Sequence, residues 1–350
     1  MPFQPDYQNI VKAARNQTAP RIPLYDHNVH CKTMEKILNK NFAHLYDGTL
    51  EDKKEYYRNF CEFYRQMGYD TVSFECCAGP AMPGSGALGN HAEGVIKSME
   101  DYIQYPWETI PDLYFKKFKN DYEALSAVMP EGMKAIGGVG NGVFECVQDI
   151  VGYMPLCYLR VDEPELYEML FKRVGDMLVE IWSKMLAMYD DTFCVYRFGD
   201  DLGFKSTTLL ATQDVKELIV PQYKRIIEVI HKTGKPFLLH SCGCIFDVMP
   251  EIIAAGIDAK HSNEDAIAPF SEWVQRYGAQ IGNFGGIDTD AVCRLQPAEM
   301  ETYIKQVFMC TQGHGGFAFG TGNSVPEYVP VENYLCMNHI ARTLRGETDF

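Results

Sequence analysis

The sequence lacks any excess of positive charge. Its 350 residues carry 32 Lys and Arg against 47 Asp and Glu, a formal net charge of −15 at pH 7. Broad electrostatic attraction to phosphate backbones or to anionic membrane surfaces requires the opposite balance. The composition therefore argues against a nucleic-acid-binding protein and against a protein that docks on a membrane.

Long apolar runs are missing too. The two longest charge-free stretches, Cys76 to Ala92 and Gln306 to Pro326, are rich in Gly and polar residues, so neither predicts a transmembrane helix. Residues 1–17 contain no apolar segment of the kind found in a signal peptide. We expect a cytoplasmic protein, in which the 12 cysteines are thiols rather than disulfides.

A dinucleotide-binding fingerprint is absent as well. The run Gly137–Gly142 (GGVGNG) comes nearest, but its spacing differs from GxGxxG. No linker, repeat or charge block divides the chain. We therefore expect one domain over residues 1–350, with a short N-terminal helical extension. A long Gly-rich loop at about residues 78–94 is typical of a lid or binding loop, and a disordered insertion is the alternative.

Short apolar runs alternate with amphipathic segments, which is typical of an α/β fold with a parallel sheet. Helical periodicity marks Glu165–Tyr189, Asp214–Lys232, Cys244–Ala255 and Pro297–Cys310. The strand candidates are Arg21–Tyr25, Thr71–Cys76, Lys134–Val139, Phe193–Phe198, Pro236–His240, Ile257–His261, Gln280–Phe284 and Gly316–Phe319. Eight strands with intervening helices predict a (β/α)8 (TIM) barrel. A doubly wound open sheet is the alternative.

Polar side chains follow nearly every predicted strand, at the end where barrel enzymes place their catalytic groups. We expect substrate-binding roles for His27, Asn141, His261 and Asn323. We expect catalytic roles for Glu75, Asp200 and Asp201.

The segment HSC places His240 and Cys242 on one turn after an apolar strand. Imidazole and thiolate both suit zinc, and a zinc site with an open coordination position is catalytic. The alternative is a core histidine beside a buried cysteine. A third ligand should come from a neighbouring strand end, where Glu264 is one candidate and Glu75 and Cys76 are others.

The adjacent carboxylates Asp200 and Asp201 (GDDLG) suit binding of a substrate hydroxyl, general-base catalysis or orientation of a histidine. The alternative is a helix N-cap beside one exposed acid. The first strand ends in YDHNVH and carries no arginine there. We therefore expect a pocket unsuited to a heavily anionic substrate.

The segments LLHSCGCIFDVMPEIIAAGIDAKHSNED, GNFGGIDTD and GTGNSVPEYVPVENY resemble the uroporphyrinogen decarboxylase superfamily. The resemblance covers nearly the whole chain, includes SMEDYIQYPW and GDDLG, and implies a (β/α)8 barrel of that type. True decarboxylases carry an Arg-rich motif after the first strand, which Asp26–His30 lacks. The corrinoid-dependent methyltransferase branch has a His-x-Cys zinc motif that matches His240 and Cys242. Glu264 falls near a Glu ligand of methionine synthase-like members.

The thiol-activating members have a further Cys ligand where this chain has Thr321. The resemblance therefore implies a methyl ether as the substrate, as in anaerobic O-demethylase systems that act on methoxylated aromatics. It also implies a zinc cofactor and a corrinoid protein as partner. Alternatives are a methylcobamide:thiol methyltransferase, a metal-free decarboxylase of a small carboxylated substrate, and a non-enzymatic corrinoid-sensing or scaffold barrel. Formation of a homodimer stays open.

Overall fold

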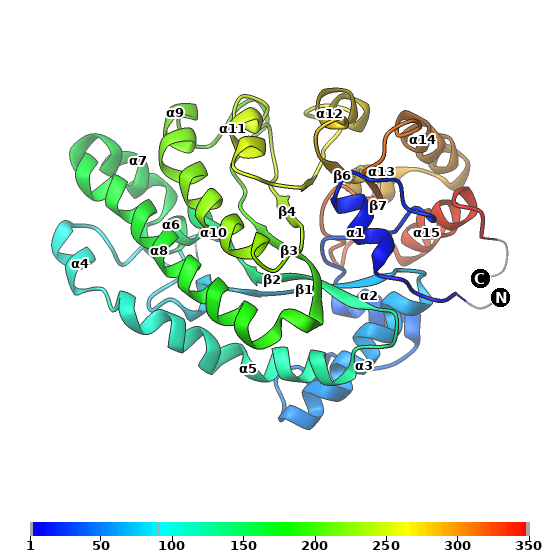
Figure 1. Cartoon of the computed structure of the whole chain (residues 1–350), viewed down its shortest axis with the longest axis horizontal. Coiled ribbons are helices and arrows are strands. Elements are labelled where there is room, and N and C mark those ends of the chain that lie inside the picture. Colours follow the sequence, from blue (N-terminus) through cyan, green and yellow to red (C-terminus); the bar gives the residue numbers. More distant parts are fainter. Residues whose placement is uncertain (1–2, 90, 348–350) are drawn as a thin grey trace.

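The parallel sheet is the centre of the molecule. A computed structural model describes residues 3–89 and 91–347. Seven parallel strands lie side by side in chain order (Figure 1). They are β1 (Thr71–Cys77), β2 (Lys134–Gly140), β3 (Phe193–Gly199), β4 (Phe237–His240), β5 (Ala259–His261), β6 (Gly282–Ile287) and β7 (Phe317–Thr321). The strand predictions from Thr71 onward are confirmed in place and order.

The predicted strand Arg21–Tyr25 is reduced to a single bridge. Leu24 pairs in parallel with Phe319 of β7, and the Tyr25 N–H donates to the Phe319 carbonyl at 2.9 Å. Toward β1 the contact is made by a side chain, since the Ser73 hydroxyl donates to the carbonyl of His27. Within residues 3–89 and 91–347 no backbone ladder joins this segment to β1. The sheet is therefore a half-barrel, and the expected closed barrel is present only in part.

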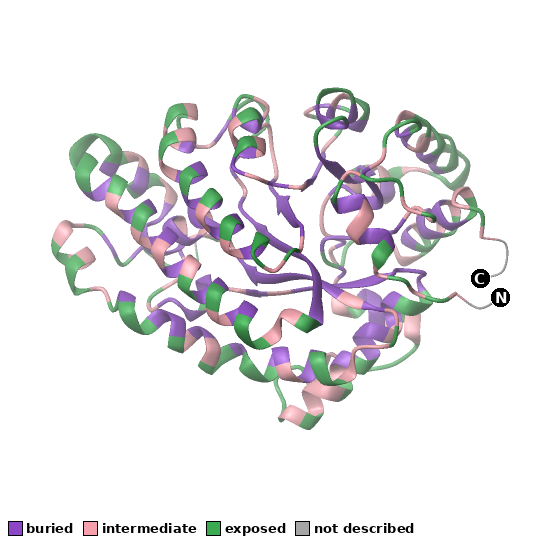
Figure 2. Ribbon diagram, viewed as in Figure 1, coloured by how far each residue is buried: buried purple, intermediate pink, exposed green. Residues whose placement is uncertain are grey.

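Helices surround the sheet, and their inner faces are buried while their outer faces meet solvent (Figure 2). Those that precede β3 are α1 (Gln8–Ala14), α2 (Cys31–Leu38), α3 (Leu50–Gln66), α4 (Met99–Gln104), α5 (Ile110–Val128), α6 (Val143–Val151), α7 (Tyr153–Asp162) and α8 (Pro164–Tyr189). Those that follow β3 are α9 (Thr212–Asp214), α10 (Val220–His231), α11 (Met249–Ala254), α12 (Phe270–Tyr277), α13 (Thr289–Arg294), α14 (Pro297–Cys310) and α15 (Val331–Leu344). No helix of the described chain is long and apolar enough to cross a membrane.

Two helix predictions need correction. The segment predicted over Asp214–Lys232 contains a π-helical stretch, Val215–Ile219, between α9 and α10. The helix predicted from Cys244 begins only at Met249. The preceding turn is held elsewhere, because the Cys244 N–H donates to the carbonyl of Phe204 at 2.6 Å.

The glycine run Gly137–Gly142 is mostly strand β2 rather than a phosphate-binding loop. Gly137 has φ +136°, and a Cβ there would lie 1.7 Å from the Phe74 carbonyl oxygen of β1. Only glycine permits this close approach of two strands. The glycines therefore serve packing within the sheet.

The predicted loop 78–94 is largely irregular, and residue 90 lies outside the described residues. It is tied to α6, since the N–H groups of Gly86 and Leu88 donate to the Asp149 carboxylate at 2.8 and 3.1 Å. The loop thus lies against the helix that follows β2.

Candidate metal centre and adjoining cavities

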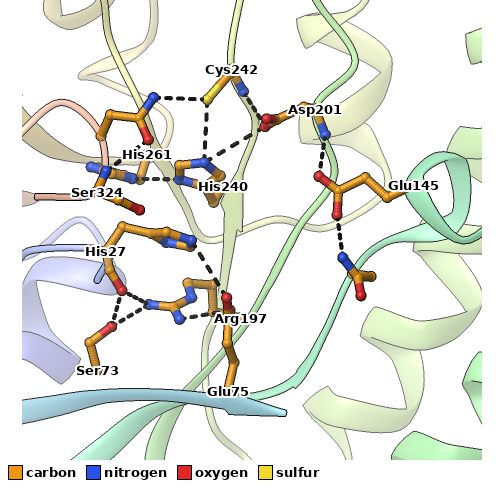
Figure 3. A network of polar contacts seen from close by, with 12 residues as sticks. His27, Ser73, Glu75, Glu145, Arg197, Asp201, His240, Cys242, His261 and Ser324 are labelled. Carbon is orange, nitrogen blue, oxygen red and sulfur yellow. Dashed lines mark hydrogen bonds and ion pairs between the residues drawn. The ribbon is translucent and has the colours of Figure 1, made fainter. Parts of the chain in front are cut away.

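Three neighbouring strands bring the candidate ligands together at their C-terminal ends. Gly199 of β3 pairs with His240 of β4, which pairs with His261 of β5. Because parallel strands end at the same edge of a sheet, the residues that follow them meet there. Figure 3 shows Asp201, His240, Cys242 and His261 converging at this edge.

Asp201, His240 and Cys242 form a group whose ligand atoms all lie within 4.8 Å of one another. His240 Nε2 is 3.4 Å from Cys242 Sγ and 3.7 Å from Asp201 Oδ1. Tetrahedral zinc with bonds of about 2.0–2.3 Å places its ligand atoms roughly 3.3–3.6 Å apart. The donor set and its spacing therefore fit zinc, with three protein ligands and an open position.

Hydrogen bonds behind His240 select its tautomer. The Thr321 carbonyl can only accept, so His261 Nε2, 2.8 Å away, carries a proton. In a neutral ring His261 Nδ1 is then an acceptor, and His240 Nδ1, 2.8 Å from it, must donate. This leaves a lone pair on His240 Nε2, the atom that faces Cys242 and Asp201. The chain from Thr321 to His240 thus presents the metal-binding nitrogen.

Burial sets the charge of these groups. It holds the pKa of His240 well below 6.5, helped by the neighbouring His261, and lowers the pKa of His261 to about 3. Burial, together with the Asp201 charge, raises the pKa of the Cys242 thiol to about 12. Asn323 Nδ2 donates to Cys242 Sγ at 3.2 Å. The imidazoles are therefore neutral, as ligands must be, and Cys242 is a thiol until a cation binds.

His27 continues the histidine cluster on the far side of His240. The two rings stack with their centroids 3.7 Å apart, and the ligand atoms of His27, His240 and His261 lie within 4.8 Å of one another. Both nitrogens of His261 are already engaged, by Thr321 and by His240. His27 Nε2 lies 3.7 Å from Glu75 Oε1. Burial and the nearby charge of Arg197 hold the pKa of His27 well below 6.5.

Asp200 and Asp201 point to different places. Both Asp200 oxygens accept backbone N–H groups at the start of α6, from Phe144 at 3.0 Å and Glu145 at 2.8 Å. Burial raises the pKa of Asp200 to about 6. Asp201 accepts the Cys242 N–H at 2.9 Å and keeps a side chain that is 45% exposed. Of the pair, only Asp201 faces the candidate metal centre.

Glu264 and Asn141 lie outside both of these groups of ligand atoms. Glu264 forms an ion pair with Lys205. Asn141 donates to Glu145 Oε2 at 2.7 Å and accepts the Gly79 N–H at 3.1 Å. Asp201 thus occupies the position beside His240 and Cys242 for which we expected Glu264.

Arg197 and Glu145 were missed by reasoning from strand ends. Arg197 lies within β3 and is 1% exposed, and its Nη2 donates to Glu75 Oε2 at 2.7 Å. The end of the first strand carries no arginine, but Arg197 of β3 lies in the same region with its charge paired to Glu75. Glu145 accepts the Asp201 N–H at 3.3 Å. Burial and the nearby carboxylates of Asp200 and Asp201 raise the pKa of Glu145 well above its usual range.

Two cavities adjoin the centre. One of about 700 Å³, the polar cavity, is lined by Asn323, Glu264, Lys205 and Asp288 among others. The other, of about 180 Å³, is lined by five aromatic residues and by polar side chains that include His27, Glu75 and Arg197. We call it the aromatic cavity, and its rings are Tyr46, Tyr56, Tyr57, Phe60 and Phe74.

Comparisons with known proteins agree with this architecture. A family model described as uroporphyrinogen decarboxylase (URO-D) matches residues 7–344. A methyltransferase from Methanosarcina mazei is similar in structure, with TM-score 0.73 and 11% identity over 96% of this chain and 98% of that one. A Listeria monocytogenes protein assigned as a vitamin B12-independent methionine synthase has TM-score 0.54 and 13% identity over 95% of this chain and 100% of that one. No curated protein matches the sequence. At such identities the structural likeness establishes the fold alone.

Proposed function

The chain belongs to the uroporphyrinogen decarboxylase family, and from that premise we propose that it is a zinc- and corrinoid-dependent methyltransferase. It moves a methyl group from a small methylated substrate, which we take to be a methoxylated aromatic, to the cobalt of a corrinoid held by a partner protein. The observation that carries this proposal is the Asp201, His240 and Cys242 group, with spacing suited to zinc. The two similar structures, whose names denote methyl-transferring enzymes, support it.

Each residue of the centre has a role in this proposal. Zinc bound there would supply Lewis-acid polarisation of an ether oxygen or a thiol. His240 offers Nε2 because His261 and Thr321 hold its other nitrogen. Cys242 gives up its proton on binding, and Asn323 donates to the sulfur.

The carboxylates behind Asp201 limit the charge of the centre. Burial and the nearby carboxylates of Asp200 and Asp201 raise the pKa of Glu145, so its surroundings oppose a further negative charge beside the thiolate. Thr321 contributes its backbone carbonyl rather than a ligand. With three protein ligands, one position stays open for substrate.

Metal content and methyl transfer test the proposal together. We expect near-stoichiometric zinc in the chain purified without chelator, loss of zinc in Cys242→Ala, and retention in Cys244→Ala, a cysteine outside the group. Zinc-loaded protein should transfer the methyl group of 2-methoxyphenol to a reduced corrinoid protein, followed by the cobalt absorbance. Zinc that persists in Cys242→Ala would overturn the assignment. So would a zinc-free wild-type chain that releases CO2 from a carboxylated aromatic without corrinoid.

A further inference from the structure

The aromatic cavity adjoins the candidate metal centre at His27. His27 lines the cavity and stacks on His240. We propose that this cavity binds an uncharged, single-ring phenol, and that Glu75 and Arg197 bind its hydroxyl group. That this phenol is the methyl donor rests on the proposed function, whereas its binding does not.

Five aromatic rings line part of the cavity, and the polar end of one of them, Tyr57, is engaged elsewhere. The Tyr57 hydroxyl donates to Asp121 at 3.1 Å, so the phenol group of Tyr57 is tied outside the cavity. Tyr57 packs edge-on against both Tyr56 and Phe74, with centroids 5.0 and 5.7 Å apart. Rings held in this way favour an aromatic guest, through offset and edge-to-face contacts.

The polar lining retains unused hydrogen-bonding capacity. Arg197 donates through Nη2 to Glu75 Oε2 at 2.7 Å, and the second N–H of Nη2 has no partner among the described residues. Glu75 Oε1 is 3.7 Å from His27 Nε2, beyond hydrogen-bond length. A hydroxyl is both donor and acceptor, so it can donate to Glu75 and accept from Arg197.

The charges of the lining select against ionic guests. Arg197 stays protonated, since Tyr25 and Glu75 raise its pKa despite burial, and it is paired with the Glu75 carboxylate. A carboxylate guest would face Glu75, and an ammonium guest would face Arg197. Either would add an uncompensated charge to a buried ion pair, which is costly. An aromatic cage for a methylated ammonium group would lack such an arginine.

The volume limits the size of the guest. A buried cavity of about 150 Å³ holds a benzene molecule. The aromatic cavity, at about 180 Å³, therefore has room for one ring with one or two small substituents. A tetrapyrrole exceeds this space.

Calorimetric titration of the zinc-loaded protein, without corrinoid, tests the proposal. The probe is 2-methoxyphenol, compared with 1,2-dimethoxybenzene, 2-methoxynaphthalene, 2-methoxybenzoate and (2-methoxyphenyl)trimethylammonium. We expect 2-methoxyphenol to bind at least tenfold more tightly than every other compound. Equal or tighter binding of any of the four, 1,2-dimethoxybenzene included, would overturn it.

Variants locate the binding. Tyr46 is 37% exposed, so Tyr46→Ala should fold, and Phe60→Trp should fill the cavity. We expect each to weaken 2-methoxyphenol binding at least tenfold and to leave the zinc content unchanged. Tyr158→Ala, at a 62% exposed position on α7, is the matched control and should bind normally. Normal binding by both Tyr46→Ala and Phe60→Trp would refute the cavity assignment. Cavity-dependent binding without methyl transfer would refute the proposed function alone.

Discussion

At the scale of single residues, Asp200 has a structural role, whereas Asp201 faces the candidate metal centre. Asp200 is fully buried and accepts the first N–H groups of α6 and the hydroxyl of Tyr223. Asp201 accepts the Cys242 N–H and faces His240. These two adjacent residues therefore differ in role. Asp200 binds the N-terminus of α6, and Asp201 is a candidate metal ligand.

We therefore expect opposite effects from the same substitution at these two positions. In Asp200→Asn, the side-chain NH2 group would face backbone N–H donors and could not accept from them. We expect this to lower the free energy of unfolding by about 1–3 kcal/mol, with zinc content retained. Asp201→Asn should lose zinc affinity and change stability little, since its side chain is 45% exposed. Urea unfolding and zinc titration of both variants provide the check. Loss of zinc from Asp200→Asn without loss of stability would contradict the structural role of Asp200.

A second prediction concerns His261, which contacts the centre only through His240. His261→Leu removes the acceptor for His240 Nδ1 and leaves the Thr321 carbonyl without its donor. Loss of such an outer partner lowers metal affinity by about 10- to 100-fold. His261→Gln can both accept and donate, so it should recover part of that affinity. Chelator competition measures both variants, and wild-type affinity in His261→Leu would refute the role.

The sequence predicts part of this site and not the rest. His240 and Cys242 share a local motif, so their proximity follows from spacing alone. Whether Asp201 or Glu264 lies beside His240 and Cys242 depends on how the loops fold, and in the structure Glu264 pairs with Lys205 instead. Arg197 carries a signal that strand ends do not show, because it is a charged residue within an otherwise apolar strand. Such a residue is stable there only with buried partners.

At the scale of elements, the strands are more predictable than the turns between them. The apolar runs of β1 and β3 mark strands because both faces of a parallel sheet are buried. The late start of α11 depends on the Cys244 to Phe204 backbone bond, a contact between two loops that local periodicity does not contain. In the described chain, Arg21–Tyr25 also forms no backbone ladder with β1, and this result likewise depends on tertiary contacts rather than on the local sequence.

The end of α10 is tied to the sheet by a titratable pair. His231 Nε2 lies 2.7 Å from Asp258 Oδ2, and this hydrogen bond raises the pKa of His231. The folded state therefore favours the protonated ring. The stabilisation is complete below the unfolded pKa of about 6.5 and is lost as the pH rises through the folded-state value.

His231→Gln should thus be less stable than wild type at low pH and nearly equal to it at high pH. Because His231 is partly exposed, we expect at most about 1 kcal/mol. Asp258→Asn is the contrasting variant, since Asp258 also accepts the Phe237 N–H at 2.8 Å and should be needed at both pH values. Urea unfolding at about pH 5.5 and 8.5, on either side of the His value, measures the effect. A larger cost at the higher pH would refute it.

At the scale of the whole molecule, the two ends of the half-barrel have separate tasks. α1 covers the end where the strands begin. The Tyr7 N–H donates to the Gly132 carbonyl just before β2, and the Asp6 N–H donates to Asp70 just before β1. Ile10, Ala13 and Ala14 pack in a cluster with inward side chains of the strands. All of the candidate ligands lie at the opposite end.

Because the two ends are separate, we expect that a mutation can lower the free energy of unfolding without affecting zinc or ligand binding, and the reverse. Ile10 is fully buried in the cluster that α1 forms with the strands, and Ile10→Ala should cost about 2–5 kcal/mol through lost contacts and a cavity. Its zinc content and its 2-methoxyphenol affinity should stay at wild-type values below the unfolding transition. Cys242→Ala should show the reverse, with the half-buried thiol contributing little to folding of the metal-free chain. Unfolding curves of the zinc-free proteins, together with zinc and ligand titrations of the folded ones, separate the two effects. If Ile10→Ala lost zinc while still folded, the two ends would be coupled through the sheet, and the strand interior rather than the rim would control the geometry of the centre.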